Sequence, residues 1–310
     1  MRALIKQFFL QSDEWLELNE LLYDAVGVRL NDKKKNQYYC LGILNNRILS
    51  ILDGPHIVDL DNMESLVSFS KQLQVHEVNL KPKQIYIKFP AVHIGSNFKN
   101  RDQVLRDIGF KKQQWLTAFV DLTYEKDFLF KLIEHSARKS IKKCQRLGLA
   151  VSRCRNYEEF IEKFCNGYLN NSNKIWSPKL KYKYDCMWSL HERVYQFFYI
   201  EYDGMVIATL GAYQYGDHAT EIMSSIASNA RKLKLPAQDI LHWEVFNFYR
   251  ELGLKKFDLA GYSPSPLSTK EHGIMKFKKK WGVVEMRADI FTKDISFFQF
   301  IKSFLRKIYA

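Results

Sequence analysis

The segment 258–282 holds the densest group of residues in the sequence that could do chemistry. It reads DLAGYSPSPLSTKEHGIMKFKKKWG and begins with the last three residues of an expected strand, KKFDLA (255–260). The loop that begins this segment is rich in Gly, Ser and Pro, and irregular backbone at the carboxyl end of a strand is where ligand sites tend to form. The lysines that follow supply fixed positive charge beside that loop. The segment is therefore our first candidate for a ligand site.

Two residues of this segment have side chains suited to handling protons or orienting a charged group. Asp258 lies at the strand end and could orient a lysine, although a structural cap is an equal interpretation. Tyr262 could hold a substrate or relay a proton, although a packed loop tyrosine is at least as good an interpretation. The remaining candidates from the segment are Gly261, Lys276, Phe277, Lys278 and Trp281.

A second candidate is Arg231, which precedes an expected helix at 236–252. Pro236 is acceptable at a helix start, where its missing N–H does no harm, and Gly253 marks the end. The N-terminus of a helix attracts anions. Arg231 is therefore a candidate phosphate contact, with ordinary surface charge as the alternative.

The clearest helical pattern covers 127–147. Apolar residues recur there at spacings of three and four, and Gly148 stands where a C-cap belongs. The opposite face carries basic side chains with no acid among them, namely Arg138, Lys139, Lys142, Lys143 and Arg146. Such a run is either a solvated helix face or a stripe that faces phosphates.

Several other chemistries find no support in the sequence. The histidines share no ligand-like spacing, so we expect no metal site. No Gly-x-Ser-x-Gly elbow or Cys/His arrangement indicates a covalent nucleophile. The five cysteines are an odd number without a CxxC pair, which favours reduced core thiols over a disulfide framework.

The overall charge is strongly positive. Lys and Arg total 47 against 34 Asp and Glu, a difference of +13 in 310 residues. Such a surface attracts nucleic acid, nucleotide phosphates or anionic membrane, with a generally lysine-rich composition as the alternative. No window has the length of a membrane span and the start does not resemble a signal peptide, so we expect a cytoplasmic protein. The basic, amphipathic stretch 297–310 could touch the inner face of a membrane, or pack back on the protein.

The remaining elements alternate in a way that predicts two similar layers. A hairpin at 38–44 and 47–52 opens the first half, and an antiparallel meander over 194–228 dominates the second. Each is followed by a helix and a further strand. This order is typical of an α/β (α+β) fold and argues against a doubly wound parallel sheet.

Several of these motifs, taken in order along the chain, resemble the FemAB-type aminoacyltransferases, the tRNA-dependent enzymes that add amino acids to the peptide of cell-wall precursors. QSDEWLEL is similar to the family's opening segment, and FVDL followed by SARKSIKKCQRLGLAV is similar to its central helix. RKLKLPAQDILHWEVFNF next to GLKKFDLAGYSP resembles its second-domain helix and strand. GIMKFKKKWG resembles its closing signature of glycine, Phe-Lys and glycine.

The resemblance implies two tandem GNAT-like (acyl-CoA N-acyltransferase-like) domains with mixed, largely antiparallel sheets. We expect the first at 1–135, completed by 290–310, and the second at 136–289 with the active cleft. In the family's pattern the lysine of the Phe-Lys pair stabilises the oxyanion of a tetrahedral intermediate, and it falls here on Lys278, with Phe277 packed beside it. Transfer would be direct, from donor to acceptor amine.

The donor implied by the resemblance is aminoacyl-tRNA, with no bound cofactor. GNAT enzymes that use acyl-CoA cradle its pyrophosphate on a glycine-rich turn, whereas this chain has RKLKLPA at 231–237. Pro236 also removes one N–H. The implied acceptor is a nucleotide- or lipid-linked precursor. Two alternatives remain, an acyl-CoA-dependent N-acyltransferase acting on an amino sugar or peptide, and a non-catalytic protein that binds RNA or membrane.

Overall fold

The computed structural model describes residues 12, 15–16, 19, 26–31, 38–57 and 59–295. The chain divides into two compact units, one of residues 1–115 and 286–310 and the other of residues 116–285. Our sequence-based division placed the change of domain at 135/136 instead. The C-terminal stretch 297–310, and most of the opening segment QSDEWLEL, lie outside the described residues.

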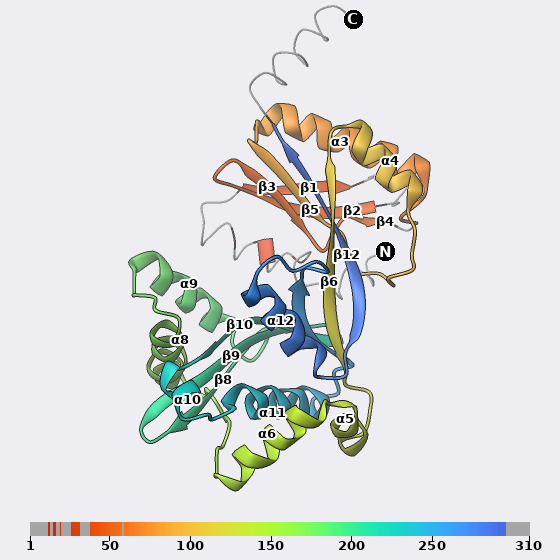
Figure 1. Ribbon diagram of the computed structural model, residues 1–310. Coiled ribbons are helices and arrows are strands. Elements are labelled where there is room, and N and C mark those ends of the chain that lie inside the picture. The colour runs from red at the N-terminus through yellow and green to blue at the C-terminus, as the bar shows by residue number, and fades with distance from the viewer. Residues whose placement is uncertain are drawn as a thin grey trace, which may run out of the picture. The chain divides into compact units, whose positions relative to one another are not determined.

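The first unit is built on a mixed sheet (Figure 1). Its strand order is β1-β2-β3-β5-β12, with β4 paired to β2; β3 and β5 run parallel and the other pairs are antiparallel. The strands are β1 (Val26–Asn31), β2 (Tyr38–Asn45), β3 (Ile48–Leu52), β4 (His56–Ile57), β5 (Gln84–Lys88) and β12 (Val284–Asp294). The expected hairpin at 38–52 is confirmed, and its turn residues Asn46 and Arg47 have positive φ.

Helices α3 (Met63–Leu80) and α4 (Lys99–Asp107) lie side by side and pack on this sheet (Figure 1). Asn62 caps α3, because its side chain accepts a hydrogen bond from the backbone N–H of Ser65 at 2.9 Å. Leu66, Phe69 and Leu73 recur on one face of α3 and are buried against the sheet. The first unit therefore has a hydrophobic core of its own.

The second unit has a sheet in the order β6-β11-β10-β9-β8-β7. The strands are β6 (Lys111–Asp121), β7 (Ser152–Arg153), β8 (Tyr195–Tyr202), β9 (Met205–Tyr215), β10 (His218–Ile226) and β11 (Lys256–Tyr262). The expected meander is confirmed as β8, β9 and β10, which pair antiparallel. Only β10 and β11 run parallel. β6 begins in the first unit, and the unit division falls within it.

Helices cover both faces of the second sheet. Alternate residues of a strand face opposite sides, and here Phe198 and Leu210 belong to the core beneath α11, whereas Gly211 meets Phe164 on the other side. The helices are α5 (Lys126–Leu132), α6 (His135–Arg146), α7 (Tyr157–Glu159), a π-helical turn η2 (Phe160–Cys165), α8 (Asn166–Asn171), α9 (Pro178–Ser189), α10 (Ser228–Lys232), α11 (Ala237–Glu251) and α12 (Thr269–Lys279). The expected helix at 236–252 is thus confirmed as α11.

The structure corrects the single helix expected at 127–147. It forms two helices, α5 and α6, because Ile133 adopts an extended conformation between them. The backbone N–H of Glu134 donates to the carbonyl oxygen of Lys280 at 2.8 Å, so the break is held by the chain just after α12. The apolar spacing is preserved across the break, since Leu129, Ile133 and Ala137 are all buried.

Candidate active site

Strands β10 and β11 part from each other in the middle of the second sheet. They pair at only three positions, the last between Thr220 and Asp258. β10 then carries a bulge after Glu221, and β11 carries one after Asp258. Beyond the bulges β10 stays paired with β9, and β11 stays paired with β6. The facing edges of the two strands therefore lose their shared hydrogen bonds, and their backbone groups need other partners.

Lys278 of α12 supplies one of these partners. Its Nζ donates to the carbonyl oxygens of Ala260 at 3.1 Å and Gly261 at 2.9 Å. Ala260 has a φ of 63°, a conformation that is rare for a residue with a Cβ atom. The bulge thus turns two successive carbonyls to one ammonium group. An ammonium has three N–H donors, so one remains for a ligand.

The charge state of Lys278 depends on its burial and on two carboxylates. Burial lowers the pKa of Lys278, while Glu221 and Asp258 oppose that shift by favouring the charged form. Asp258 is itself fixed, because its Oδ1 accepts hydrogen bonds from Thr117 Oγ1 at 2.6 Å and from the backbone N–H of Ala260 at 2.8 Å. Asp258 thereby holds the shape of the bulge on which Lys278 sits.

Glu221 and His242 complete the cluster, and neither was a candidate from the sequence. His242 Nε2 lies 3.1 Å from Glu221 Oε2, and Ser224 Oγ donates to Glu221 Oε1 at 2.6 Å. His242 is fully buried, whereas 15% of the Glu221 side chain is exposed. Burial raises the pKa of Glu221, but His242, Ser224 and Lys278 more than offset this, and the net shift is downward.

The other candidates from α12 fall into different environments. Phe277 is half-buried and packs edge-on against His242 at 4.9 Å between ring centroids. Trp281 is fully buried and stacks on the same imidazole, so it acts through packing and does not face solvent. Lys280 forms an ion pair with Asp239 and lies over the Phe277 ring. Lys276 is exposed on the same helix.

Tyr262, at the end of β11, is buried, and its hydroxyl donates to Glu285. Burial raises the pKa of Tyr262, and the Glu285 carboxylate raises it further, so the phenol stays protonated. Lys279 also pairs with Glu285, at 3.1 Å. The structure therefore gives Tyr262 a carboxylate partner on the strand that follows α12.

Comparison with known proteins identifies this part of the chain. Residues 134–279 match the family model described as an acetyltransferase (GNAT) domain. They form a GNAT domain. The match includes the split between β10 and β11 and ends one residue beyond Lys278. By its match to this family the chain is an acyltransferase. No curated protein matches the chain by sequence.

Solved structures extend the likeness to both units. FemX is 15% identical to this chain with a TM-score of 0.70, over 93% of this chain and 94% of FemX. L-PGS from Bacillus licheniformis is 13% identical with a TM-score of 0.57, over 92% and 93%. A tandem GNAT protein from the clavulanic acid biosynthesis pathway is 8% identical with a TM-score of 0.59, over 85% and 81%. The chain therefore has the tandem GNAT fold expected from its sequence.

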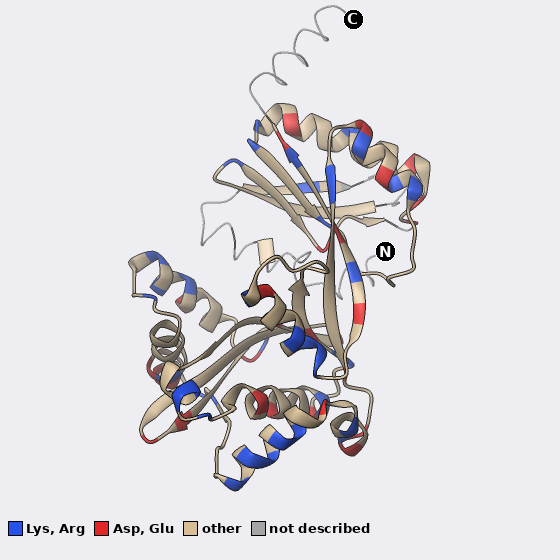
Figure 2. Cartoon of the chain, in the orientation of Figure 1, with Lys and Arg blue, Asp and Glu red and all other residues tan. Residues whose placement is uncertain are grey.

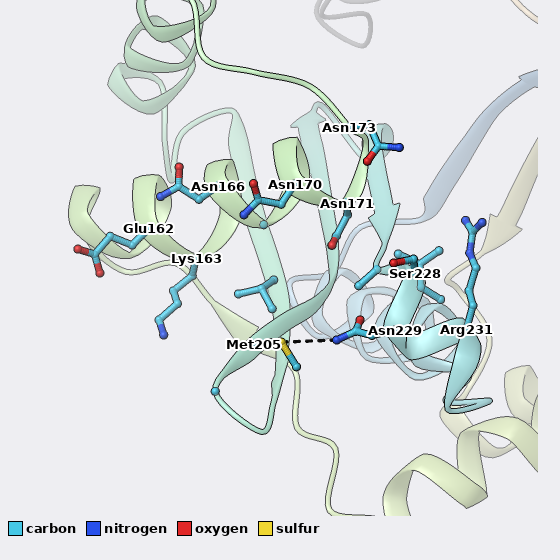
Figure 3. Close-up of a pocket in the computed structure, with 15 residues that line it drawn as sticks. Glu162, Lys163, Asn166, Asn170, Asn171, Asn173, Met205, Ser228, Asn229 and Arg231 are labelled. Carbon is cyan, nitrogen blue, oxygen red and sulfur yellow. Dashed lines mark hydrogen bonds between the residues drawn. The ribbon is translucent and has the colours of Figure 1, made fainter.

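A polar cavity of about 560 Å³ lies on the α8 side of the GNAT domain (Figure 3). Its floor is formed by the start of β9 and the end of β10, including Met205, Val206 and Ile226. Amide side chains dominate its wall, namely Asn166, Asn170, Asn171, Asn173 and Asn229. Arg231 stands at its rim on α10, exposed to solvent. The volume is that of a small-molecule site, and amides offer both donors and acceptors.

The basic face of α6 forms a ridge on the surface of the GNAT domain (Figure 2). Lys139, Lys142 and Lys143 are exposed, whereas Arg138 is half-buried and donates to the carbonyl oxygen of Lys131 at 2.6 Å. Lys143 Nζ donates to the carbonyl oxygen of Lys234 at 2.9 Å. The ridge is thus joined to the loop between α10 and α11, which carries Lys234 and follows Lys232, the last residue of α10.

Within the described residues, no group of three or more His, Cys, Asp or Glu side chains could hold a metal ion. Among the described helices, none is long and apolar enough to cross a membrane.

Proposed function

We propose that this protein transfers an aminoacyl group from aminoacyl-tRNA to an amine of a nucleotide- or lipid-linked cell-wall precursor. The observation that carries the proposal is the position of Lys278, whose ammonium spans the β11 bulge where β10 and β11 separate. An acyl group entering this split would bring its carbonyl oxygen to the remaining N–H of Lys278. A fixed donor at a developing oxyanion is worth about 3–4 kcal/mol.

The reaction needs one bond made and one broken. The acceptor nitrogen attacks the ester carbon, and the carbonyl electrons move to the oxygen that Lys278 stabilises. The oxyanion then collapses, the ester C–O bond breaks, and the ribose oxygen leaves. Lys278 stays protonated throughout, so its role is to stabilise charge that is larger in the transition state than in the ground state.

The loop before α11 favours an RNA-linked donor over CoA. The residues 231–237 include no glycine, and α11 begins after Pro236 without a side-chain cap. Asp239 lies in the first turn of α11, where its carboxylate, paired with Lys280, opposes the binding of a pyrophosphate. The segment therefore lacks the backbone cradle that acyl-CoA requires.

The basic ridge on α6 and the amide-lined cavity give such a donor its binding surface. Exposed lysines on α6 can neutralise RNA phosphates, which supply most sequence-independent affinity for nucleic acid. Arg231 at the cavity rim would contact a phosphate near the acylated end. The cavity borders the end of β10, about 13 Å along the strand from its bulge at ~3.3 Å per residue. This span suits a terminal nucleotide.

The fold comparisons agree with transfer of an amino acid. A similar fold is found in the C-terminal domain of a candidate lysylphosphatidylglycerol synthetase from Agrobacterium fabrum, with 14% identity and a TM-score of 0.57. Its name describes an aminoacyl product on a lipid-linked acceptor. A lipid-linked acceptor would also suit a membrane contact through 297–310, which stays a prediction.

An assay of aminoacyl transfer from charged tRNA, with and without RNase, tests the proposal. The full chain is incubated with a nucleotide-linked muropeptide carrying a free amine and with tRNA charged with radiolabelled amino acids. We expect label in the muropeptide, and none after RNase treatment. Label that persists after RNase would contradict the proposal.

The alternative is an acyl-CoA-dependent N-acyltransferase, which the family match to acetyltransferases favours. It predicts that millimolar CoA raises the thermal unfolding temperature and that labelled acetyl-CoA acylates an amino sugar or peptide. If both occur while charged tRNA gives no product, the alternative replaces the aminoacyl-tRNA proposal.

A further inference from the structure

The imidazole of His242 has an oxygen atom at each of its two nitrogens. Nδ1 lies 2.8 Å from the carbonyl oxygen of Gln238, one turn earlier on α11, and Nε2 lies 3.1 Å from Glu221 Oε2. A carbonyl oxygen can only accept a hydrogen bond, so Nδ1 must carry a hydrogen. This assignment fixes the tautomer of a neutral His242 ring, because a neutral imidazole has only one N–H and that hydrogen is then on Nδ1.

A neutral ring would therefore turn the lone pair of Nε2 toward an ionised carboxylate. Two acceptors at 3.1 Å repel each other, and a buried polar contact of this kind is costly. The repulsion is removed only when one proton lies between Nε2 and Oε2. His242 and Glu221 therefore hold one shared proton. Because the net pKa shift of Glu221 is downward, that proton belongs to the ring and the carboxylate is ionised.

The surroundings keep this proton within reach of the candidate site. Lys278 of α12 favours the ionised form of Glu221, and Asp258 of β11 in turn favours the charged form of Lys278. Phe277 and Trp281 pack against the ring and shield it from water. Glu221, at the β10 bulge, is the only exposed member of the pair. A proton can thus leave or enter through the Glu221 carboxyl group.

We infer that Glu221 is a further catalytic residue, which passes the proton shared with His242 to the leaving oxygen of the donor. The inference rests on the proposed function, because only an ester donor releases an alkoxide. An alkoxide is a much stronger base than a thiolate and leaves poorly unless it is protonated. His242 acts through Glu221 and is a positioning residue.

The proton balance of this step closes without another reactant. The tetrahedral intermediate forms with a cationic nitrogen and an oxyanion beside Lys278. As the C–O bond breaks, the single shared proton moves from His242 Nε2 to the Glu221 carboxylate and from there to the ribose oxygen, which leaves a neutral ring and an ionised carboxylate. The new amide nitrogen then gives its surplus proton to Glu221, which restores the charged ring. Product and resting enzyme differ from the starting state by no proton.

The resting state can be tested in the wild-type protein without any substrate. Nitrogen-15 spectra of the histidine rings, assigned by comparison with His242→Gln, should show both nitrogens of His242 protonated at neutral pH. In Glu221→Gln the amide can donate to Nε2, so the ring should become neutral while its hydrogen bond persists. A neutral His242 ring in the wild type would overturn the inference, even if aminoacyl transfer is observed.

Kinetics of Glu221→Gln tests the catalytic role. With charged tRNA we expect kcat to fall about 10²–10⁴-fold, as for the loss of a general acid, with KM for the donor unchanged. Glu158→Gln, an exposed glutamate on α7, is the matched control and should keep wild-type kcat. A Glu221→Gln variant that folds and retains its kcat would overturn the inference. An inactive wild type would refute the proposed function while leaving the ring spectra interpretable.

Discussion

Lys278 Nζ donates to the main-chain carbonyl oxygen of Gly261 at 2.9 Å, which fixes a cation of α12 on the edge of β11 that has parted from β10. Neither element produces this contact alone. The bulge turns the carbonyl outward, and the helix that begins at Thr269 brings the lysine back to it. The ammonium is then positioned by backbone atoms, whose geometry does not depend on a neighbouring side chain.

The pH dependence of kcat should report the charge of Lys278. Its protonated form stabilises the oxyanion, and burial lowers its pKa from the ordinary 10.5. On the alkaline side, activity should therefore fall as pH rises through a value below 10.5. Lys278→Arg should extend the active range upward, because a guanidinium stays charged. An alkaline limit unchanged in this variant would contradict the assignment.

Gly282 ends the α12 segment and should not tolerate a side chain. Its φ is 67°, and a Cβ atom there would lie 2.8 Å from both the Cβ atom and the carbonyl oxygen of Leu132. Gly282→Ala should lower the free energy of unfolding by about 1–3 kcal/mol, measured by denaturant titration. The control is Gly273→Ala within α12, where no atom lies within 4 Å, and it should raise stability by up to ~1 kcal/mol. Equal effects would refute the steric argument.

The basic ridge should contribute to RNA affinity through phosphate contacts. In the double variant Lys139→Ala with Lys142→Ala, the dependence of log K on log salt should weaken by about 0.7–0.9 for each lysine that contacts a phosphate. Binding of tRNA over a salt series measures this slope. Removal of two exposed lysines from the first unit, Lys71 and Lys83, should leave the slope unchanged. If both pairs behave alike, the ridge has no particular role.

Arg231 should affect the donor and not the acceptor. Because it is exposed at the rim of the amide-lined cavity, its loss should raise KM for charged tRNA by only about fivefold. KM for the muropeptide should stay the same. Arg193→Ala, in the loop before β8, is the matched exposed control. A change in KM for the muropeptide would instead indicate that the cavity binds the acceptor.

Much of the fold could be predicted from the sequence because local signals agreed with the tertiary structure. Asn156 caps α7, because its side chain accepts a hydrogen bond from the backbone N–H of Glu159 at 2.8 Å. The turns at Asp203-Gly204 and Gly216 close the meander with positive φ. The break between α5 and α6 was not visible, because the apolar spacing continues through it and its cause is a contact with Lys280, far along the chain.

Only part of the candidate site could be predicted from the sequence. Lys278 and Asp258 belong to one continuous segment, so their types and spacing drew attention. Glu221 lies in β10 and His242 in α11, far apart in the sequence. The two side chains meet only because α11 packs against the sheet, which no local pattern predicts. Glu221 is the one acidic residue of β10, and its place inside a meander strand was the one available signal for it.

The most direct test of the account is single-turnover aminoacyl transfer by Lys278→Met, which keeps the length of the side chain and removes its charge. With charged tRNA bound at saturating concentration, we expect the rate to fall about 10²–10³-fold, with tRNA affinity and unfolding temperature close to wild type. Lys270→Met, an exposed lysine at the start of α12, should transfer at the wild-type rate. A folded Lys278→Met variant that transfers within threefold of wild type would contradict the account.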